Sequence, residues 1–227
     1  MILSHKYKFI FFCNGKTGSS SIEKCLYHLH EGQEFDFDIK GIYANKHIPP
    51  VMVKACLPTS IWENYFKFVF VRNPWDWFVS GWKYRYQPTP ITLNLLATNP
   101  IQVLRAFKHF KRLKNLYSRE VFSIEDIEYF FNDSKKWRGL PYVDGWYQSN
   151  YVYDLDGNKI VDFVGHFENL EHDFSIISKK LGLTITLPHH NSSCRLKKYQ
   201  KYFNELSQKK LADLWSKDIV NFGYTFD

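Results

Sequence analysis

The residues most suited to chemistry lie near the N-terminus, in the run Gly15-Lys16-Thr17-Gly18-Ser19-Ser20-Ser21, here called the lysine loop. The apolar segment 7–13 before it is typical of a buried strand, and apolar residues after it recur at helical spacing. Backbone N–H groups and hydroxyls between a strand and a helix N-terminus bind anions, and Lys16 adds a positive charge. The loop therefore predicts a phosphate-binding site. A serine-rich helix cap with a surface lysine is the alternative.

The lysine loop is not a Walker A loop. That motif, G-x-x-x-x-G-K-[ST], would need a glycine six residues before Lys16, where Ile10 stands. A nucleotide kinase of the P-loop type is therefore disfavoured.

A second candidate pair is Arg72 and Ser80. The apolar run 66–71 predicts a strand covered on both faces, and Asn73 and Pro74 can begin the helix that follows it. Arg72 at the strand end and Ser80 two helical turns later can face the same edge of a sheet, where open α/β folds bind ligands. Arginine and a hydroxyl suit a second phosphate. The alternatives are a structural ion pair for Arg72 and an ordinary helix serine for Ser80.

The elements around these residues predict an α/β chain with a short parallel sheet at its centre. Residues 88–140 are expected to be a mostly helical insert on the substrate side, and the turn 156–158 predicts a hairpin. With 227 residues, 44% of them hydrophobic, the chain is expected to form a single domain spanning residues 1–227.

The net charge and the cysteine spacing limit the classes of partner and the cellular compartment expected for the chain. The formal charge of +7 favours anionic partners. Lysine and arginine gather in two clusters, within 105–114 and 195–201, but neither has the spacing of a DNA-reading motif. The four cysteines are far apart, which favours reduced thiols in a cytoplasm and argues against a zinc or disulfide framework. No window is long and apolar enough to predict a membrane span, and no carboxylate or histidine set predicts a metal site.

Both motifs resemble those of sulfotransferases that use 3′-phosphoadenosine 5′-phosphosulfate (PAPS). The segment F-C-N-G-K-T-G-S-S-S-I resembles their 5′-phosphosulfate loop, and F-V-F-V-R-N-P-W-D-W-F-V-S-G-W resembles their 3′-phosphate motif. Further segments are similar to the carbohydrate branch called sulfotransferase family 2: Lys46-His47-Ile48-Pro49, residues 148–168 ending in V-D-F-V-G-H-F-E-N-L, H-x-N-x-S, and F-G-Y-T-F. The resemblance implies a P-loop-like three-layer fold with helices flanking the sheet.

The resemblance also implies a role for each matching residue. Lys16 would contact the 5′-phosphosulfate, the residues after it would surround that group, and Arg72 and Ser80 would hold the 3′-phosphate; the surrounding residues are Thr17, Gly18, Ser19, Ser20 and Ser21. The chain departs from the family pattern at three positions, which carry Gly15, Trp77 and His166. The stretch around His189 and His190 is interpreted as a loop on the nucleotide side.

His47 is the candidate base. It lies in a polar loop between the first helix and the second strand, and a neutral imidazole can take the proton of an attacking hydroxyl. The expected reaction is in-line transfer of a sulfuryl group from PAPS to a carbohydrate hydroxyl, with PAP (3′-phosphoadenosine 5′-phosphate) as product and no metal required. A surface histidine is the alternative for His47.

Two other functions stay open. A nucleotide-binding, kinase-like protein would need magnesium ligands that the sequence does not indicate. A non-catalytic module for RNA or anionic glycans would use the aromatic and basic residues but leave the lysine loop unexplained. The oligomeric state and the position sulfated on the acceptor are not indicated by any motif.

Overall fold

A four-stranded sheet lies at the centre of the fold in the computed structural model, which describes residues 1–31, 47–88, 100–135, 147–187 and 198–227. The strands follow one another across the sheet in chain order: β1 (Ile2–Ser4), β2 (Phe9–Phe12), β3 (Phe66–Val71) and β4 (Phe163–His166). The strands β2, β3 and β4 are parallel, whereas β1 runs antiparallel to β2 at one edge. The expected parallel sheet is therefore present in β2, β3 and β4, and β1 makes the whole sheet mixed because a tight turn after it folds it directly onto β2.

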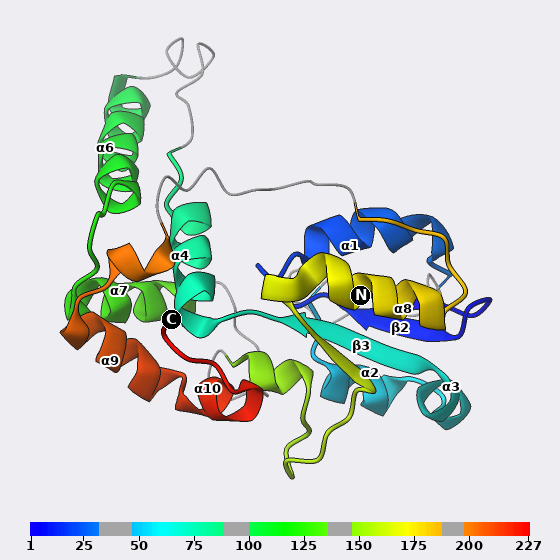
Figure 1. Ribbon diagram of the computed structural model, residues 1–227. Helices are drawn as coiled ribbons and strands as arrows, with labels where there is room; N and C mark the ends of the chain where they lie inside the picture. The colour runs from blue at the N-terminus through cyan, green and yellow to red at the C-terminus, as the bar shows by residue number, and fades with distance from the viewer. Residues whose placement is uncertain (32–46, 89–99, 136–146, 188–197) are drawn as a thin grey trace.

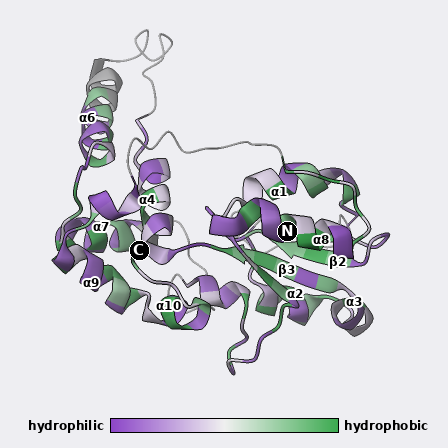
Figure 2. Ribbon diagram, viewed as in Figure 1, coloured by the Kyte–Doolittle hydropathy of each residue, from purple (hydrophilic) through white to green (hydrophobic). Residues whose placement is uncertain are grey.

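Alternating side chains cover both faces of the sheet and produce three layers. On one face, Phe9 and Phe11 of β2 and Phe68 of β3 pack with α1 (Ser19–Leu26) and α8 (Leu170–Lys180). On the opposite face, side chains of the same strands pack against α2 (Pro50–Cys56) and α3 (Thr59–Asn64): these are Ile10, Phe12, Val69 and Val71. Figure 1 shows the two pairs of helices on opposite sides of β3, and Figure 2 shows the strand largely in the hydrophobic colour.

A second group of helices lies beyond the carboxyl end of β3 (Figure 1). Its members are α4 (Pro74–Arg85), α6 (Pro100–Tyr117), α7 (Ile124–Lys135), α9 (Glu205–Leu214) and α10 (Ser216–Phe222). Their common core is aromatic, with Phe78 and Trp82 of α4 against Phe130 of α7 and with Trp215 at the junction of α9 and α10. The helix α4 therefore joins the sheet to this second core.

Residues 88–140 supply α6 and α7, in the segment predicted to be mostly helical. The helix α7 packs on α4 and α9 through Ile127 and Phe130, so it is part of the aromatic core. Ser123 caps the start of α7, since its hydroxyl accepts a hydrogen bond from the Asp126 N–H at 3.2 Å. Among the helices described, none combines the length and the apolar character needed to cross a membrane.

The remaining short elements are 3-10 helices, and they connect the larger ones. They are η1 (Tyr27–Leu29), η2 (Gln148–Tyr151), η3 (Phe167–Asn169) and η4 (Tyr199–Tyr202). The predicted turn at 156–158 is present, with Gly157 at a φ of 84°, but its arms form only the isolated bridge Tyr153–Lys159. The sheet strand begins later, at Phe163, because it pairs with β3 instead of with the other arm of the turn.

Candidate active site

The lysine loop leaves the carboxyl end of β2 in a strained conformation. Lys16 has a φ of 68° and Gly18 a φ of 78°, both in the left-handed region. A non-glycine residue rarely occupies that region unless its surroundings hold it there. The buried Thr17 closes the loop internally, since its hydroxyl donates to the Asn14 carbonyl at 2.8 Å.

A helix follows the lysine loop, as predicted, and it is α1, which begins directly after Gly18. The N–H groups of Ser21 and Ile22 donate to the Gly18 carbonyl, and those of Ser19 and Ser20 come too early in the helix to have an acceptor within it. A Cβ at position 18 would lie 2.8 Å from Cδ2 of Leu170, so α8 packs closely against the loop. The loop thus presents backbone N–H groups and the positive end of a helix at the edge of the sheet, which suits an anion.

The Lys16 ammonium lies against an aromatic ring of α4. Its Nζ is 4.2 Å from the centroid of Tyr84, a cation–π distance, and the Tyr84 side chain is largely exposed. The lysine thus extends toward the face of α4 that borders the lysine loop.

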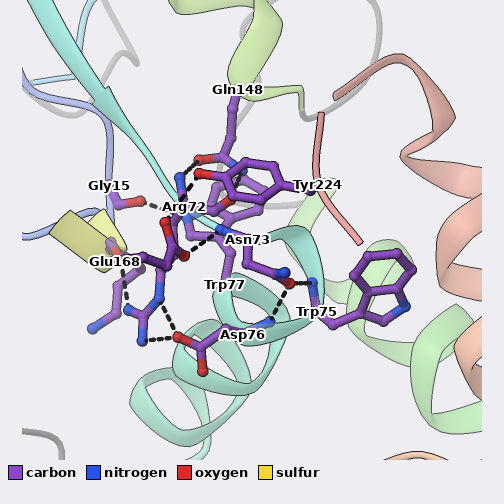
Figure 3. A network of polar contacts seen from close by, with 10 residues as sticks. Gly15, Arg72, Asn73, Trp75, Asp76, Trp77, Gln148, Glu168 and Tyr224 are labelled. Carbon is purple, nitrogen blue, oxygen red and sulfur yellow. Dashed lines mark hydrogen bonds and ion pairs between the residues drawn. The ribbon is translucent and has the colours of Figure 1, made fainter. Parts of the chain in front are cut away.

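Arg72 joins the second motif to the lysine loop. Its Nη1 donates to the Lys16 carbonyl at 2.9 Å, its Nε donates to Oδ2 of Asp76 at 2.7 Å, and its guanidinium lies 3.9 Å from the centroid of Phe167. Figure 3 shows the Arg72 and Asp76 side chains facing each other below the Asn73 turn. Arg72 thus lies beside the lysine loop, and the ion pair considered as the alternative for Arg72 is present as well. Any anion reaching Arg72 must compete with Asp76.

Ser80 lies on α4, as predicted, and is 7% exposed. In the described ranges it makes no hydrogen bond to the lysine loop or to Arg72. The predicted cap of α4 is confirmed, because the Asn73 side chain accepts from the N–H groups of Trp75 and Asp76.

His47 is anchored on Cys13, two residues before the lysine loop. Its Nδ1 lies 2.6 Å from the carbonyl oxygen of Cys13, and its own carbonyl accepts a hydrogen bond from the Tyr151 hydroxyl at 2.8 Å. A carbonyl can only accept, so the hydrogen of the neutral ring must be on Nδ1. The basic nitrogen of the neutral ring is then Nε2, as a general base requires. The neighbouring Lys46 lies outside the described residues.

Gln148 connects the ends of β2 and β3 beneath the site. Its Oε1 accepts from the Arg72 N–H at 2.8 Å and from Asn14 Nδ2 at 3.3 Å, and its Nε2 donates to the Arg72 carbonyl at 2.6 Å. Gln148 is in turn held by the buried Asp218, whose Oδ2 accepts from the Gln148 N–H while Oδ1 accepts from the N–H and hydroxyl of Ser149. The fully buried side chain of Gln148 therefore fixes the two strand ends relative to each other.

Asp218→Asn should destabilise the protein by about 1–3 kcal/mol, because an amide NH₂ would face one of the donor groups and leave it unpaired. Burial raises the pKa of Asp218 to about 6, although hydrogen bonds from Ser149 and Gln148 oppose the shift. A carboxyl with a raised folded-state pKa stabilises the fold at low pH, and this contribution is lost as the pH rises from about 4 to about 6. Urea unfolding should show that the free energy of unfolding of the wild type falls with pH across this range. Asp218→Asn should lack this pH dependence. An equal pH dependence of the free energy of unfolding in the two proteins would exclude Asp218 as its source.

Glu168, Tyr224 and His166 form a second supporting group. Glu168 Oε1 accepts from the Asn73 N–H at 2.7 Å, and its Oε2 accepts from the Tyr224 hydroxyl at 3.1 Å. Burial raises the pKa of the Tyr224 hydroxyl, so the phenol keeps its proton and remains a donor. His166 Nδ1 lies 3.0 Å from the same hydroxyl. The group fixes the C-terminal segment to the turn between β3 and α4, as Figure 3 shows for Glu168, Tyr224 and Asn73.

No group of three or more histidine, cysteine, aspartate or glutamate side chains is placed to hold a metal ion within the described ranges. The predicted nucleotide-side loop around His189 and His190 lies outside those ranges.

Comparison with known proteins identifies the family. The model that describes sulfotransferase family 2 matches residues 1–225, so the chain belongs to this sulfotransferase family. One similar protein is an uncharacterized protein of Archaeoglobus fulgidus, 24% identical over 147 residues, which cover 60% of this chain and 83% of that protein. No solved structure matches the chain.

Three residues of the site had no supporting role assigned from the sequence: Gln148, Glu168 and Tyr224. Each occurs in a segment that resembles the family, and this resemblance was the available signal. Their roles depend on long-range contacts to Arg72, Asn73 and Asn14, which no local pattern reveals.

Proposed function

We propose that this sulfotransferase transfers a sulfuryl group from PAPS to a carbohydrate hydroxyl, with the lysine loop holding the 5′-phosphosulfate. PAPS supplies the sulfuryl group on a phosphate leaving group. The observation that carries the proposal is the lysine loop itself, in which left-handed Lys16 and Gly18 lie between a parallel strand and the N-terminus of α1. Such consecutive backbone N–H groups are a general anion-binding arrangement, and a loop between a strand and a helix N-terminus is a common place for a phosphate group to bind.

In this proposal Lys16 neutralises the negative charge that builds on the departing phosphate oxygen. An ammonium suits that task because its charge is compact and its stem is flexible enough to follow the leaving group. The backbone N–H groups at Ser19 and Ser20 and the neighbouring hydroxyls hold the remaining oxygens. We assign Arg72 and Ser80 to the 3′-phosphate.

His47 accepts the proton of the acceptor hydroxyl as the new sulfur–oxygen bond forms and the bond to the phosphate breaks. Support comes from its anchor on the Cys13 carbonyl, three residues before Lys16, which keeps Nε2 as the basic nitrogen. A base and a leaving-group lysine attached to the same strand end can act on opposite ends of an in-line displacement.

The acceptor class rests on the resemblance to the carbohydrate branch. The helices α6 and α7, from the proposed substrate-side insert, lie on the same side as α4 (Figure 1). We propose that this side of the molecule receives the acceptor, and that the chain works as a single domain in the cytoplasm.

Calorimetric titration with PAP, ATP and RNA tests the donor assignment. We expect PAP to bind without added magnesium and more tightly than ATP, because PAP has a 3′-phosphate for Arg72 and Ser80 to bind and ATP has none. Tight, magnesium-dependent ATP binding would support the kinase-like alternative, and binding of RNA alone would support the non-catalytic module.

Ser80→Ala should weaken PAP binding about ten- to a hundredfold, the range for losing one hydrogen bond to a charged group. Binding of adenosine 5′-phosphosulfate, which lacks the 3′-phosphate, should be unchanged in this variant. Arg72→Ala should weaken PAP more than adenosine 5′-phosphosulfate but affect both, because Arg72 also holds the Lys16 carbonyl. Calorimetry with both nucleotides measures the difference.

The matched control is Ser178→Ala, which removes a similarly buried hydroxyl on α8. It should leave both affinities near those of the wild type. Equal losses of both nucleotides in Ser80→Ala would show that Ser80 serves the fold or another part of the donor.

A further inference from the structure

Three buried tryptophans of α4 each donate their indole N–H to a backbone carbonyl in a different segment. Trp75 bonds the Gln208 carbonyl at 3.1 Å, Trp77 bonds the Gly15 carbonyl at 2.6 Å, and Trp82 bonds the Leu116 carbonyl at 2.6 Å. Of these three bonds, the Trp77 bond alone ends in the lysine loop (Figure 3).

The Gly15 carbonyl is next to Lys16 on its N-terminal side, and the Lys16 carbonyl follows on its C-terminal side. Trp77 holds the first and Arg72 Nη1 holds the second at 2.9 Å. These two peptide groups set the φ and ψ angles of Lys16, whose φ is 68°. A strained residue of this kind persists only where its surroundings fix it, and the two hydrogen bonds supply that constraint.

The Trp77 ring is itself held in place. It is 4% exposed and packs against Trp215 with ring centroids 4.9 Å apart. Arg72 is also held in place, by its ion pair with Asp76, the residue before Trp77. The lysine loop is therefore attached on both sides of Lys16 to the strand-to-helix segment 72–77.

We infer that Trp77 is a positioning residue, which keeps Lys16 in its left-handed conformation by holding the Gly15 carbonyl. The inference rests on the proposed function, in which Lys16 meets the donor. Preorganised groups stabilise the developing charge without rearranging during the reaction, so loosening the loop should reduce both donor affinity and turnover.

The test compares Trp77→Phe with Trp82→Phe. Each substitution keeps a buried aromatic ring on α4 and removes one indole hydrogen bond of 2.6 Å. Trp82 bonds a segment outside the lysine loop, so its variant reports the general cost of the change. Three quantities are measured for each variant: the urea midpoint of unfolding, the affinity for PAP, and the rate at which trypsin cuts the Lys16–Thr17 bond.

We expect Trp77→Phe to bind PAP at least about tenfold more weakly than the wild type, as for the loss of a buried hydrogen bond. Trypsin should cut after Lys16 at least about tenfold faster in Trp77→Phe than in Trp82→Phe, at a comparable urea midpoint. Trp82→Phe should keep its PAP affinity within about twofold of the wild type.

The trypsin measurement needs no ligand, so it separates this inference from the proposed function. Failure of the wild type to bind PAP, together with fast cleavage in Trp77→Phe, would reject the donor and leave the positioning role intact. Equal cleavage after Lys16 in the two variants, or unchanged PAP affinity in Trp77→Phe, would overturn the positioning role.

Discussion

Lys16→Ala should lower kcat at least about 100-fold while the fold is retained, the size of effect seen when one preorganised group is removed from a developing anion. Alanine carries a Cβ like lysine, so the left-handed conformation costs the variant about as much as the wild type. The side chain makes its cation–π contact with the exposed Tyr84, and losing that contact has a small effect on stability. Steady-state rates measure the loss of kcat, and the urea midpoint shows whether the fold is retained.

Lys24→Ala is the matched control, since Lys24 is exposed on α1 and eight residues after Lys16. It removes the same charge from the helix that follows the lysine loop but should leave kcat unchanged. A wild-type rate in Lys16→Ala, or an equal loss in both variants, would contradict the assignment of Lys16 to the leaving group.

Replacing His47 should reduce kcat by about 10²–10⁴-fold with little change in PAP affinity, because a base acts on the acceptor. The acidic limb of the pH–rate profile should disappear, since that limb reports protonation of the base. Rates and PAP titrations of His47→Ala measure the two effects separately.

His47→Asn separates chemistry from structure. The asparagine amide can still donate to the Cys13 carbonyl in place of Nδ1, but it has no basic nitrogen. We expect it to be as slow as His47→Ala. Recovery of most of the wild-type rate in His47→Asn would mean that the Cys13 anchor matters and that another group is the base.

Local patterns were sufficient to predict the two motif-bearing strands and the helices that follow them. Continuous apolar runs marked β2 and β3, and Asn73 with Pro74 marked the start of α4. These signals lie within a few residues of the element they define, so a sequence can carry them without knowledge of the fold.

Elements defined by tertiary contacts were missed or misplaced. The edge strand β1 has three residues, and β4 contains Gly165, where a Cβ would lie 2.4 Å from the Phe70 ring. The helical spacing of the apolar residues in 211–222 is typical of one helix, but the chain forms α9 and α10 with a break at Trp215. Packing against distant residues decided these features.

The site was predictable in its motifs but not in its supporting contacts. Gly15 and Trp77 were identified as separate departures from the family pattern, yet the structure joins them by a hydrogen bond. His166, the third departure, contacts Tyr224 at the other end of the chain. The two partners are 62 positions apart in the Gly15–Trp77 contact and 58 positions apart in the His166–Tyr224 contact. Only the fold brings them together.

Incubation of the protein with PAPS labelled on the sulfuryl group, against a panel of carbohydrates, phenols and tyrosine peptides, tests the central claim most directly. We predict transfer of label to one or more carbohydrates by the wild type and by Lys24→Ala, with at least about 100-fold less by Lys16→Ala. Transfer to phenols or peptides alone would reject the carbohydrate acceptor but keep the donor. Labelled product formed equally fast by Lys16→Ala would contradict the proposed role of the lysine loop. Absence of transfer to every acceptor, in a protein that also fails to bind PAP, would contradict PAPS-dependent sulfuryl transfer itself.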